Sequence, residues 1–186
     1  MGKSTVRQVW AKMGAYAIDS DEVYHRLLRE DTDLLAALQN TFPEASASGI
    51  LDRKELGRMV FSDPKQRREL ERITHGPVVA AVEQELASAR RQGYKVVAVE
   101  ALYLLETPLR EGLSAVVGVI APQDQRIQRI VARDGVSRNY AAHRIAAQPD
   151  DDYYRARCTH ILENNAGTET LIRWAEELFT GVTIEN

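Results

Sequence analysis

Two apolar runs in the second half of the chain constrain its fold more than any other feature. Residues 96–99 and 115–120 are rich in valine and isoleucine, and polar and apolar positions do not alternate along them. Strands of this kind are buried on both faces, which is typical of a parallel sheet. Because stretches with helical patterning separate the strands, we expect an α/β sheet covered by helices.

The rest of the chain reads as further helices and two further short strands. We expect the short strands at residues 15–18 and 160–162. Asp52 and Asp63 are placed to cap helices, and Pro77 is expected to open a new one. The helices are expected over residues 4–13, 21–29, 33–40, 52–61, 64–73, 77–92, 122–134, 137–147 and 168–179.

Length and composition limit the classes of protein that fit. A chain of 186 residues with 44% hydrophobic and 27% charged residues is an ordinary globular domain, so we expect a single domain over residues 1–186. Its net charge of -3 argues against a general binder of nucleic acid or membrane surfaces. The single cysteine, Cys158, excludes an intramolecular disulfide. With no apolar run of membrane-spanning length and no leader pattern, we expect a cytoplasmic protein.

The first residues, Gly2-Lys3-Ser4-Thr5, match the end of a phosphate-binding loop. In such a loop backbone N–H groups cradle phosphates, the lysine neutralises them and the hydroxyl binds Mg²⁺. The alternative is an ordinary N-terminal helix, because three matching residues are a weak signal. If the loop interpretation is right, the first strand and half of the glycine loop, roughly a dozen residues, are lacking.

Acidic residues follow the first expected strand. Asp19 and Asp21 lie where a strand meets a helix, which is the edge at which open α/β sheets bind ligands. A carboxylate there can accept a hydroxyl proton or hold Mg²⁺ through water during phosphoryl transfer. The alternative is that both residues only cap the next helix.

Arginines form a stripe on a later helix. Arg126, Arg129 and Arg133 are spaced i, i+3 and i+7, so they share one helical face, and Arg144 follows downstream. Arginine binds phosphate oxygens bidentately, which favours a lid over a nucleotide. A solvated charged face is the alternative. Asn164, in the turn after the last strand, could contact a base or serve only the turn.

Together these segments resemble the dephospho-CoA kinase family over essentially the whole chain. The resemblance is strongest in the middle block, which is long and specific. The matching segments are residues 2–5, 19–21, 51–53, 56, 60–64, 70–71, 75, 102–106, 125–134, 144–148 and 161–165.

The resemblance implies a P-loop kinase that transfers the γ-phosphoryl group of MgATP to the ribose 3′-hydroxyl of dephospho-CoA. It implies an α/β fold with a five-stranded parallel P-loop kinase sheet, a helical CoA-binding region at about residues 30–92 and a lid at about 122–148. ATP and Mg²⁺ are the implied cofactors. The implied ATP-binding residues are Gly2, Lys3, Ser4, Thr5, Arg133, Arg144 and Asn164.

The remaining implied roles concern catalysis, the acceptor and the metal. Asp21 is the leading candidate for activating the acceptor hydroxyl, with Asp19 beside it, and Ser4 is the candidate Mg²⁺ ligand. The implied catalytic residues are Asp21, Asp19, Lys3, Arg129 and Arg133, and the implied acceptor-binding residues are Asp21, His75 and Glu106.

Three residues depart from the family pattern: Leu102 replaces a proline, Gly76 separates His75 from Pro77, and Thr159 stands where an acid is usual. A larger departure is the first strand, which in this family lies between the strands expected at 96–99 and 115–120. Without it, backbone groups stay unpaired at about 1–3 kcal/mol each, so we expect poor stability and little activity.

Two other functions stay open from the sequence. One is a non-catalytic relative that binds a CoA-like ligand or a protein partner. The other is a P-loop kinase for another small molecule, such as a nucleoside.

Overall fold

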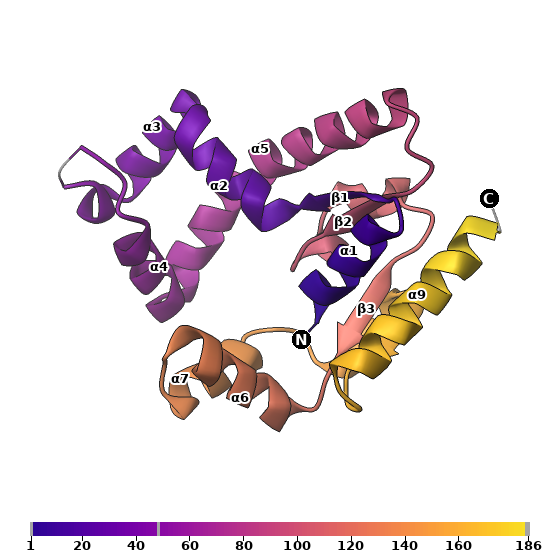
Figure 1. Cartoon of the computed structure of the whole chain (residues 1–186). Coiled ribbons are helices and arrows are strands. Elements are labelled where there is room, and N and C mark those ends of the chain that lie inside the picture. The colour runs from indigo at the N-terminus through magenta and orange to yellow at the C-terminus, as the bar shows by residue number, and fades with distance from the viewer. Residues whose placement is uncertain (1, 48, 185–186) are drawn as a thin grey trace. The chain divides into compact units, whose positions relative to one another are not determined.

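The structure is a computed structural model that describes residues 2–47 and 49–184, and helices and short strands alternate along it (Figure 1). The four strands are β1 (Tyr16–Asp19), β2 (Val97–Glu100), β3 (Val117–Ile120) and β4 (His160–Glu163). The α-helices are α1 (Lys3–Lys12), α2 (Ser20–Glu30), α3 (Thr32–Thr41), α4 (Arg53–Ser62), α5 (Pro64–Arg91), α6 (Gln123–Asp134), α7 (Arg138–Ala146), α8 (Asp151–Arg157) and α9 (Thr168–Ile184). Short 3₁₀ helices lie at Pro43–Ser46, Leu104–Glu106 and Pro108–Gly112.

The chain divides into two compact units, which we describe separately. The first unit comprises Met1–Ala17, Tyr94–Glu100 and Arg110–Asn186. The second comprises Ile18–Gly93 and Ala101–Leu109. Strands β2, β3 and β4 and the arginine-bearing helices thus belong to the first unit and the middle helices to the second, while β1 begins in the first unit and ends in the second.

The strands form two separate pairs. β3 pairs with β4 in parallel, with Val117 opposite His160 and Ile120 opposite Glu163. β1 pairs with β2, where the Tyr16 N–H donates to the Val96 carbonyl at 3.0 Å. Within the described residues β2 and β3 do not pair with each other, as predicted from the family's strand order. The described chain therefore has two two-stranded sheets in place of the five-stranded sheet that the resemblance implies.

Helix α1, α9 and the β3–β4 pair share one buried apolar cluster (Figure 1). The Trp10 indole N–H donates to the Ala175 carbonyl at 2.8 Å, which ties α1 to α9. The buried side chains of this cluster are Val6, Val9, Val119, Leu162, Leu171 and Ala175. Because these contacts are apolar and close, they hold α1 at a fixed angle to the strands.

The second unit is a helical bundle with its own apolar core. Arg26 on α2 reaches Glu85 on α5, with 2.6 Å between Nη2 and Oε1. The buried core residues are Leu28, Leu34, Leu38, Phe42, Ala45, Leu56, Met59 and Val60. Asp52 and Asp63 cap α4 and α5 as predicted.

Two predictions about helices were wrong. Pro77 does not open a new helix, because α5 runs unbroken from Pro64 to Arg91 with Pro77 inside it. Gly76 explains this, since a residue without a Cβ escapes the clash that normally keeps the residue before proline out of the helical conformation. The sequence reading also missed α8, a seven-residue helix that Asp150 caps by accepting from the Tyr153 N–H at 2.8 Å.

Candidate functional site

The turn before α1 is built so closely that only glycine fits at position 2. Gly2 has φ +118°, a backbone conformation that side-chain-bearing residues rarely adopt. A Cβ there would lie 2.6 Å from Leu171 Cδ2 and 2.8 Å from Asn164 Nδ2. The end of the β4 turn and the start of α9 therefore press directly on this backbone.

The residues that follow Gly2 form the first turn of α1. Lys3 and Thr5 are half-buried, whereas Ser4 is exposed. The first turn holds no acidic residue, and its N–H groups have no acceptor within the helix itself. Such an end attracts anions through its amides and through the positive end of the helix dipole.

Asn164 connects this turn to the arginine-bearing helix. Its backbone N–H donates to the Ile120 carbonyl at 2.8 Å, and its residue is 4% exposed. Arg129 Nη2 lies 3.5 Å from Asn164 Oδ1 and 3.3 Å from Gln125 Oε1. The start of α1, Asn164 and Arg129 are thus neighbours at the carboxyl ends of β3 and β4, the edge where open α/β sheets bind ligands.

The arginines of the predicted stripe on α6 interact with different partners. The Arg126 side chain is only 11% exposed, and its Nη2 lies 3.3 Å from Asp151 Oδ1 on α8. Arg133 lies at the other end of α6 with a side chain 71% exposed. The shared helical face was predicted correctly, but α8 covers one end of it, so Arg126 serves the α6–α8 contact.

Arg133 and Arg144 converge on one carboxylate, that of Asp134. Arg133 Nε donates to Asp134 Oδ1 at 2.6 Å, and Arg144 Nη1 donates to Asp134 Oδ2 at 2.8 Å. The Arg133 hydrogen bond, helped by Arg144, holds the pKa of Asp134 below its usual value. Asp134 ends the segment 125–134 that matches the family, but no role was predicted for it.

In the second unit, Asp19 is the N-cap of α2. Its Oδ1 accepts from the Asp21 N–H at 2.9 Å and from the Glu22 N–H at 3.4 Å. Asp19 therefore caps α2, whereas its predicted part in phosphoryl transfer stays a prediction. Asp21 sits in the first turn of α2 and is exposed. Between the two acids, Ser20 is buried, and its hydroxyl has no hydrogen-bond partner within the described residues.

A second cluster in this unit gathers around Tyr103. The His75 and Tyr103 ring centroids are 6.3 Å apart, at an interplanar angle of 42°. Burial, followed by the nearby carboxylates of Glu71 and Glu106, raises the pKa of Tyr103, while Arg67 opposes this rise. The fold thus brings together His75 and Glu106, which the sequence reading selected, and adds Tyr103 and Arg67, which it did not.

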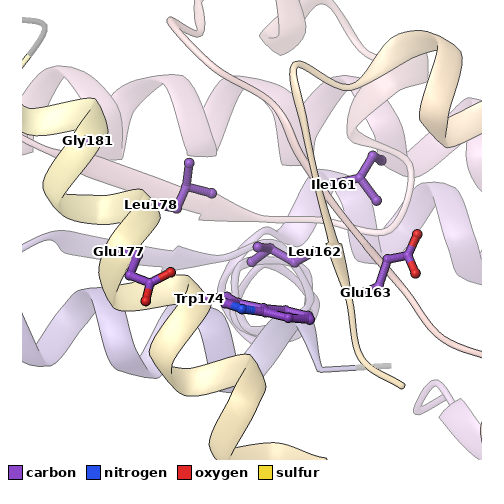
Figure 2. Close-up of a pocket in the computed structure, with 7 residues that line it drawn as sticks. All are labelled: Ile161, Leu162, Glu163, Trp174, Glu177, Leu178 and Gly181. Carbon is purple, nitrogen blue, oxygen red and sulfur yellow. The ribbon is translucent and has the colours of Figure 1, made fainter. Parts of the chain in front are cut away.

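A cavity of about 470 Å³ opens elsewhere, between β4 and α9 (Figure 2). Leu162, Trp174 and Leu178 face it, with the carboxylates of Glu163 and Glu177 beside them (Figure 2). None of the predicted site residues lines this cavity.

The described residues contain neither a metal-ligand cluster nor a membrane-spanning helix. No group of three or more His, Cys, Asp or Glu side chains is arranged to hold a metal ion. None of the helices has both the length and the apolar character needed to cross a membrane.

Comparison with known proteins shows one family. The family model described as dephospho-CoA kinase matches residues 1–170. A protein named dephospho-CoA kinase from Geobacter sulfurreducens is 33% identical over 180 residues, which cover 96% of this chain and 91% of the relative. Another of that name, from Anaeromyxobacter dehalogenans, is 37% identical over 95% of this chain and 85% of its own.

Solved structures share the fold. A Thermus thermophilus protein called TT1252 has a TM-score of 0.78 and 34% identity, covering 97% of this chain and 91% of its own. The dephospho-CoA kinase from Campylobacter jejuni has a TM-score of 0.70 at 23% identity, covering 100% of this chain and 93% of its own. At that identity the likeness concerns the fold alone. The neighbours agree with the predicted P-loop kinase-like α/β class.

Proposed function

The chain belongs to the dephospho-CoA kinase family, and we propose from that membership which of its residues take part in phosphoryl transfer and in which role. The reaction is the ATP-dependent phosphorylation of dephospho-CoA in coenzyme A biosynthesis. We assign the acceptor as the ribose 3′-hydroxyl. The other two functions left open by the sequence, a non-catalytic relative and a kinase for another small molecule, gain no support from the comparisons.

The nucleotide phosphates bind at the start of α1. The observation that carries this assignment is the Gly2 turn, whose backbone has no room for a side chain beside Asn164 and Leu171. Glycine allows the φ of +118° with which the chain enters α1, and the N–H groups of the first helical turn, which have no acceptor within the helix, can then donate to phosphate oxygens. The amides of Lys3, Ser4 and Thr5 then cradle the phosphates, and the Lys3 ammonium neutralises the β/γ oxygens.

The residues around this turn fit a magnesium ion. Mg²⁺ prefers oxygen ligands and is usually held by one or two side chains together with substrate phosphates. The exposed Ser4 hydroxyl, in the first turn of α1, is of that kind, and we assign it as the protein ligand. When bound, the ion offsets negative charge on the β- and γ-phosphates.

Arginines and Asn164 complete the ATP side. Arg129 and Arg133 neutralise the charge that develops on the transferred phosphoryl group, and Arg144 contacts the ATP phosphates. Asn164, which the resemblance implies as an ATP-binding residue, is buried beside Gly2. These roles rest on the family resemblance and on the contacts of Arg129 with Asn164 and of Arg133 and Arg144 with Asp134.

The acceptor side uses the acidic residues of α2. Asp21 accepts the proton of the acceptor hydroxyl as that oxygen attacks the γ-phosphorus, and ADP leaves. Asp19 fixes the position of Asp21 by accepting its backbone N–H. His75 and Glu106 contact dephospho-CoA, and Tyr103 lies beside His75.

The test of this assignment is a set of isosteric substitutions in α2, with turnover measured by mass detection of coenzyme A. Asp21→Asn is expected to lower kcat about 10²–10⁴-fold, because the general base is lost. Glu22→Gln is the matched control, since it removes the same charge from the same exposed turn. Asp19→Asn keeps a good N-cap, so it separates the charge of Asp19 from its capping function.

The outcomes discriminate clearly. Equal kcat in Asp21→Asn and in the Glu22→Gln control would remove Asp21 from the catalytic role. Phosphorylation of nucleosides in preference to dephospho-CoA would reject the acceptor assignment. A cytoplasmic location remains a prediction from the sequence.

A further inference from the structure

Asp134 is held by two arginines from two helices. The Arg133 guanidinium donates two hydrogen bonds to this carboxylate through its Nε–Nη2 edge, the side fork: Nε donates to Oδ1 at 2.6 Å and Nη2 donates to Oδ2 at 3.0 Å. Arg144, on α7, adds a hydrogen bond from Nη1 to Oδ2 at 2.8 Å. A bidentate guanidinium–carboxylate pair of this kind has the same geometry as an arginine–phosphate pair.

The end of α6 does not itself favour a carboxylate at position 134. Asp134 is the last residue of α6, and a negative charge at a helix C-terminus faces the negative end of the dipole. Nor is it needed to dock α7 on α6, because Ile127, Ala141 and Ile145 form a buried apolar contact between these two helices. Neither the stability of α6 nor the packing of α7 on it therefore accounts for an acid at position 134.

We propose that Asp134 is an internal counter-anion of the ATP site, which occupies the side fork of Arg133 until a phosphate group of ATP displaces it. The inference rests on the proposed function, in which Arg133 and Arg144 bind ATP. Asp134 thereby weakens ATP binding and lets the nucleotide leave after transfer. Asp134 Oδ2 accepts from both Arg133 and Arg144, so Asp134 keeps Arg144 as a partner while Arg133 turns to the phosphate.

The charge state of the pair agrees with this role. Hydrogen bonding to Arg133 lowers the pKa of Asp134, and the same bond raises the pKa of Arg133. Both groups are thus charged at neutral pH, and an anion must compete with a carboxylate to reach Arg133. Because exposed ion pairs are weak, the competition changes an equilibrium constant by up to about fivefold.

The experiment measures the Kd for MgATP by calorimetry in the full chain and in Asp134→Asn, which keeps the shape and removes the charge. The expected result is binding that is about two- to fivefold tighter. The matched control is Asp124→Asn. Asp124 accepts from Arg138 at 2.8 Å and so makes a second ion pair between α6 and α7, one that includes none of the arginines assigned to ATP. This control is expected to leave the Kd unchanged.

The same measurement in an Arg133→Ala variant separates the counter-anion role of Asp134 from the assignment of Arg133 to ATP. Arg133→Ala is expected to weaken ATP binding, and adding Asp134→Asn to it is expected to change the Kd less than Asp134→Asn does alone, because only the pair with Arg144 is then lost. Weaker or unchanged binding in Asp134→Asn alone would overturn the counter-anion role, even with Arg133→Ala weakening ATP. An unchanged Kd in Arg133→Ala would instead reject the assignment of Arg133 to ATP. Circular dichroism of each variant confirms that the helices are retained.

Discussion

Replacing Gly2 by alanine tests the tightest contact of the phosphate site. The new Cβ meets two obstacles. It forces a residue with a side chain into φ +118°, which costs about 1–3 kcal/mol. It also lies 2.6 Å from Leu171 Cδ2 and 2.8 Å from Asn164 Nδ2. Leu171 is 1% exposed and Asn164 4%, so neither can move aside into solvent, and overpacking adds about 1–3 kcal/mol.

Gly14→Ala is the control that isolates the packing term. Gly14 has φ +101°, but nothing lies within 4 Å of a Cβ built there. Gly14→Ala therefore measures the cost of backbone strain alone, about 1–3 kcal/mol in the free energy of unfolding. Gly2→Ala is expected to exceed Gly14→Ala by about 1–3 kcal/mol in the free energy of unfolding, and to weaken ATP binding while Gly14→Ala does not.

Urea denaturation measures both variants, with the comparison restricted to transitions of equal m-value. A further variant, Asn164→Ala, removes one of the two obstacles, so its combination with Gly2→Ala is expected to cost less than the sum of the single changes. Equal destabilisation by Gly2→Ala and Gly14→Ala would refute the reasoning, because it would mean that the Leu171 and Asn164 side chains move away from the new Cβ with no loss of stability.

Two further predictions concern stability. Thr159→Val is expected to lower the free energy of unfolding by about 1–3 kcal/mol, since the Thr159 hydroxyl accepts from the Val116 N–H at 2.8 Å and donates to the Val116 carbonyl at 2.9 Å. Thr159→Ser keeps the hydroxyl and serves as its control in the same urea assay. Ser20→Ala is expected to raise stability by about 0.5–1 kcal/mol, because it removes a buried hydroxyl that lacks a partner in the described chain and adds a better helix former. A thermal melt that shows Ser20→Ala to be less stable would contradict this and indicate a hydrogen bond to Ser20.

Much of the local structure was predictable because its causes are local. Asp52 and Asp63 cap helices through N–H groups two or three residues away, and this pattern is readable in any sequence. Pro77 was misread because its effect depends on Gly76, whose missing Cβ allows a continuous helix. Helix α8 is only seven residues long, and a segment that short carries little periodicity.

The candidate site shows the same division. The Gly2-Lys3-Ser4-Thr5 motif and the pair Asp19 and Asp21 were visible in the sequence, since residue type and spacing define them. Sequence spacing also put Arg126 and Arg133 on one face of α6. It could not show that Asp151 would pair with Arg126, because that contact joins two helices that are separate in the chain.

The sequence by itself determined the class of fold, the family and the chemistry, because hydrophobic pattern, capping residues and motifs act over short distances along the chain. Only the tertiary structure decided which charges meet. Asp134 engages Arg133 and Arg144 because α7 folds back on α6, and Asn164 crowds Gly2 because the β4 turn ends beside α1. Such contacts depend on the packing of apolar cores, which places residues side by side regardless of their separation in sequence.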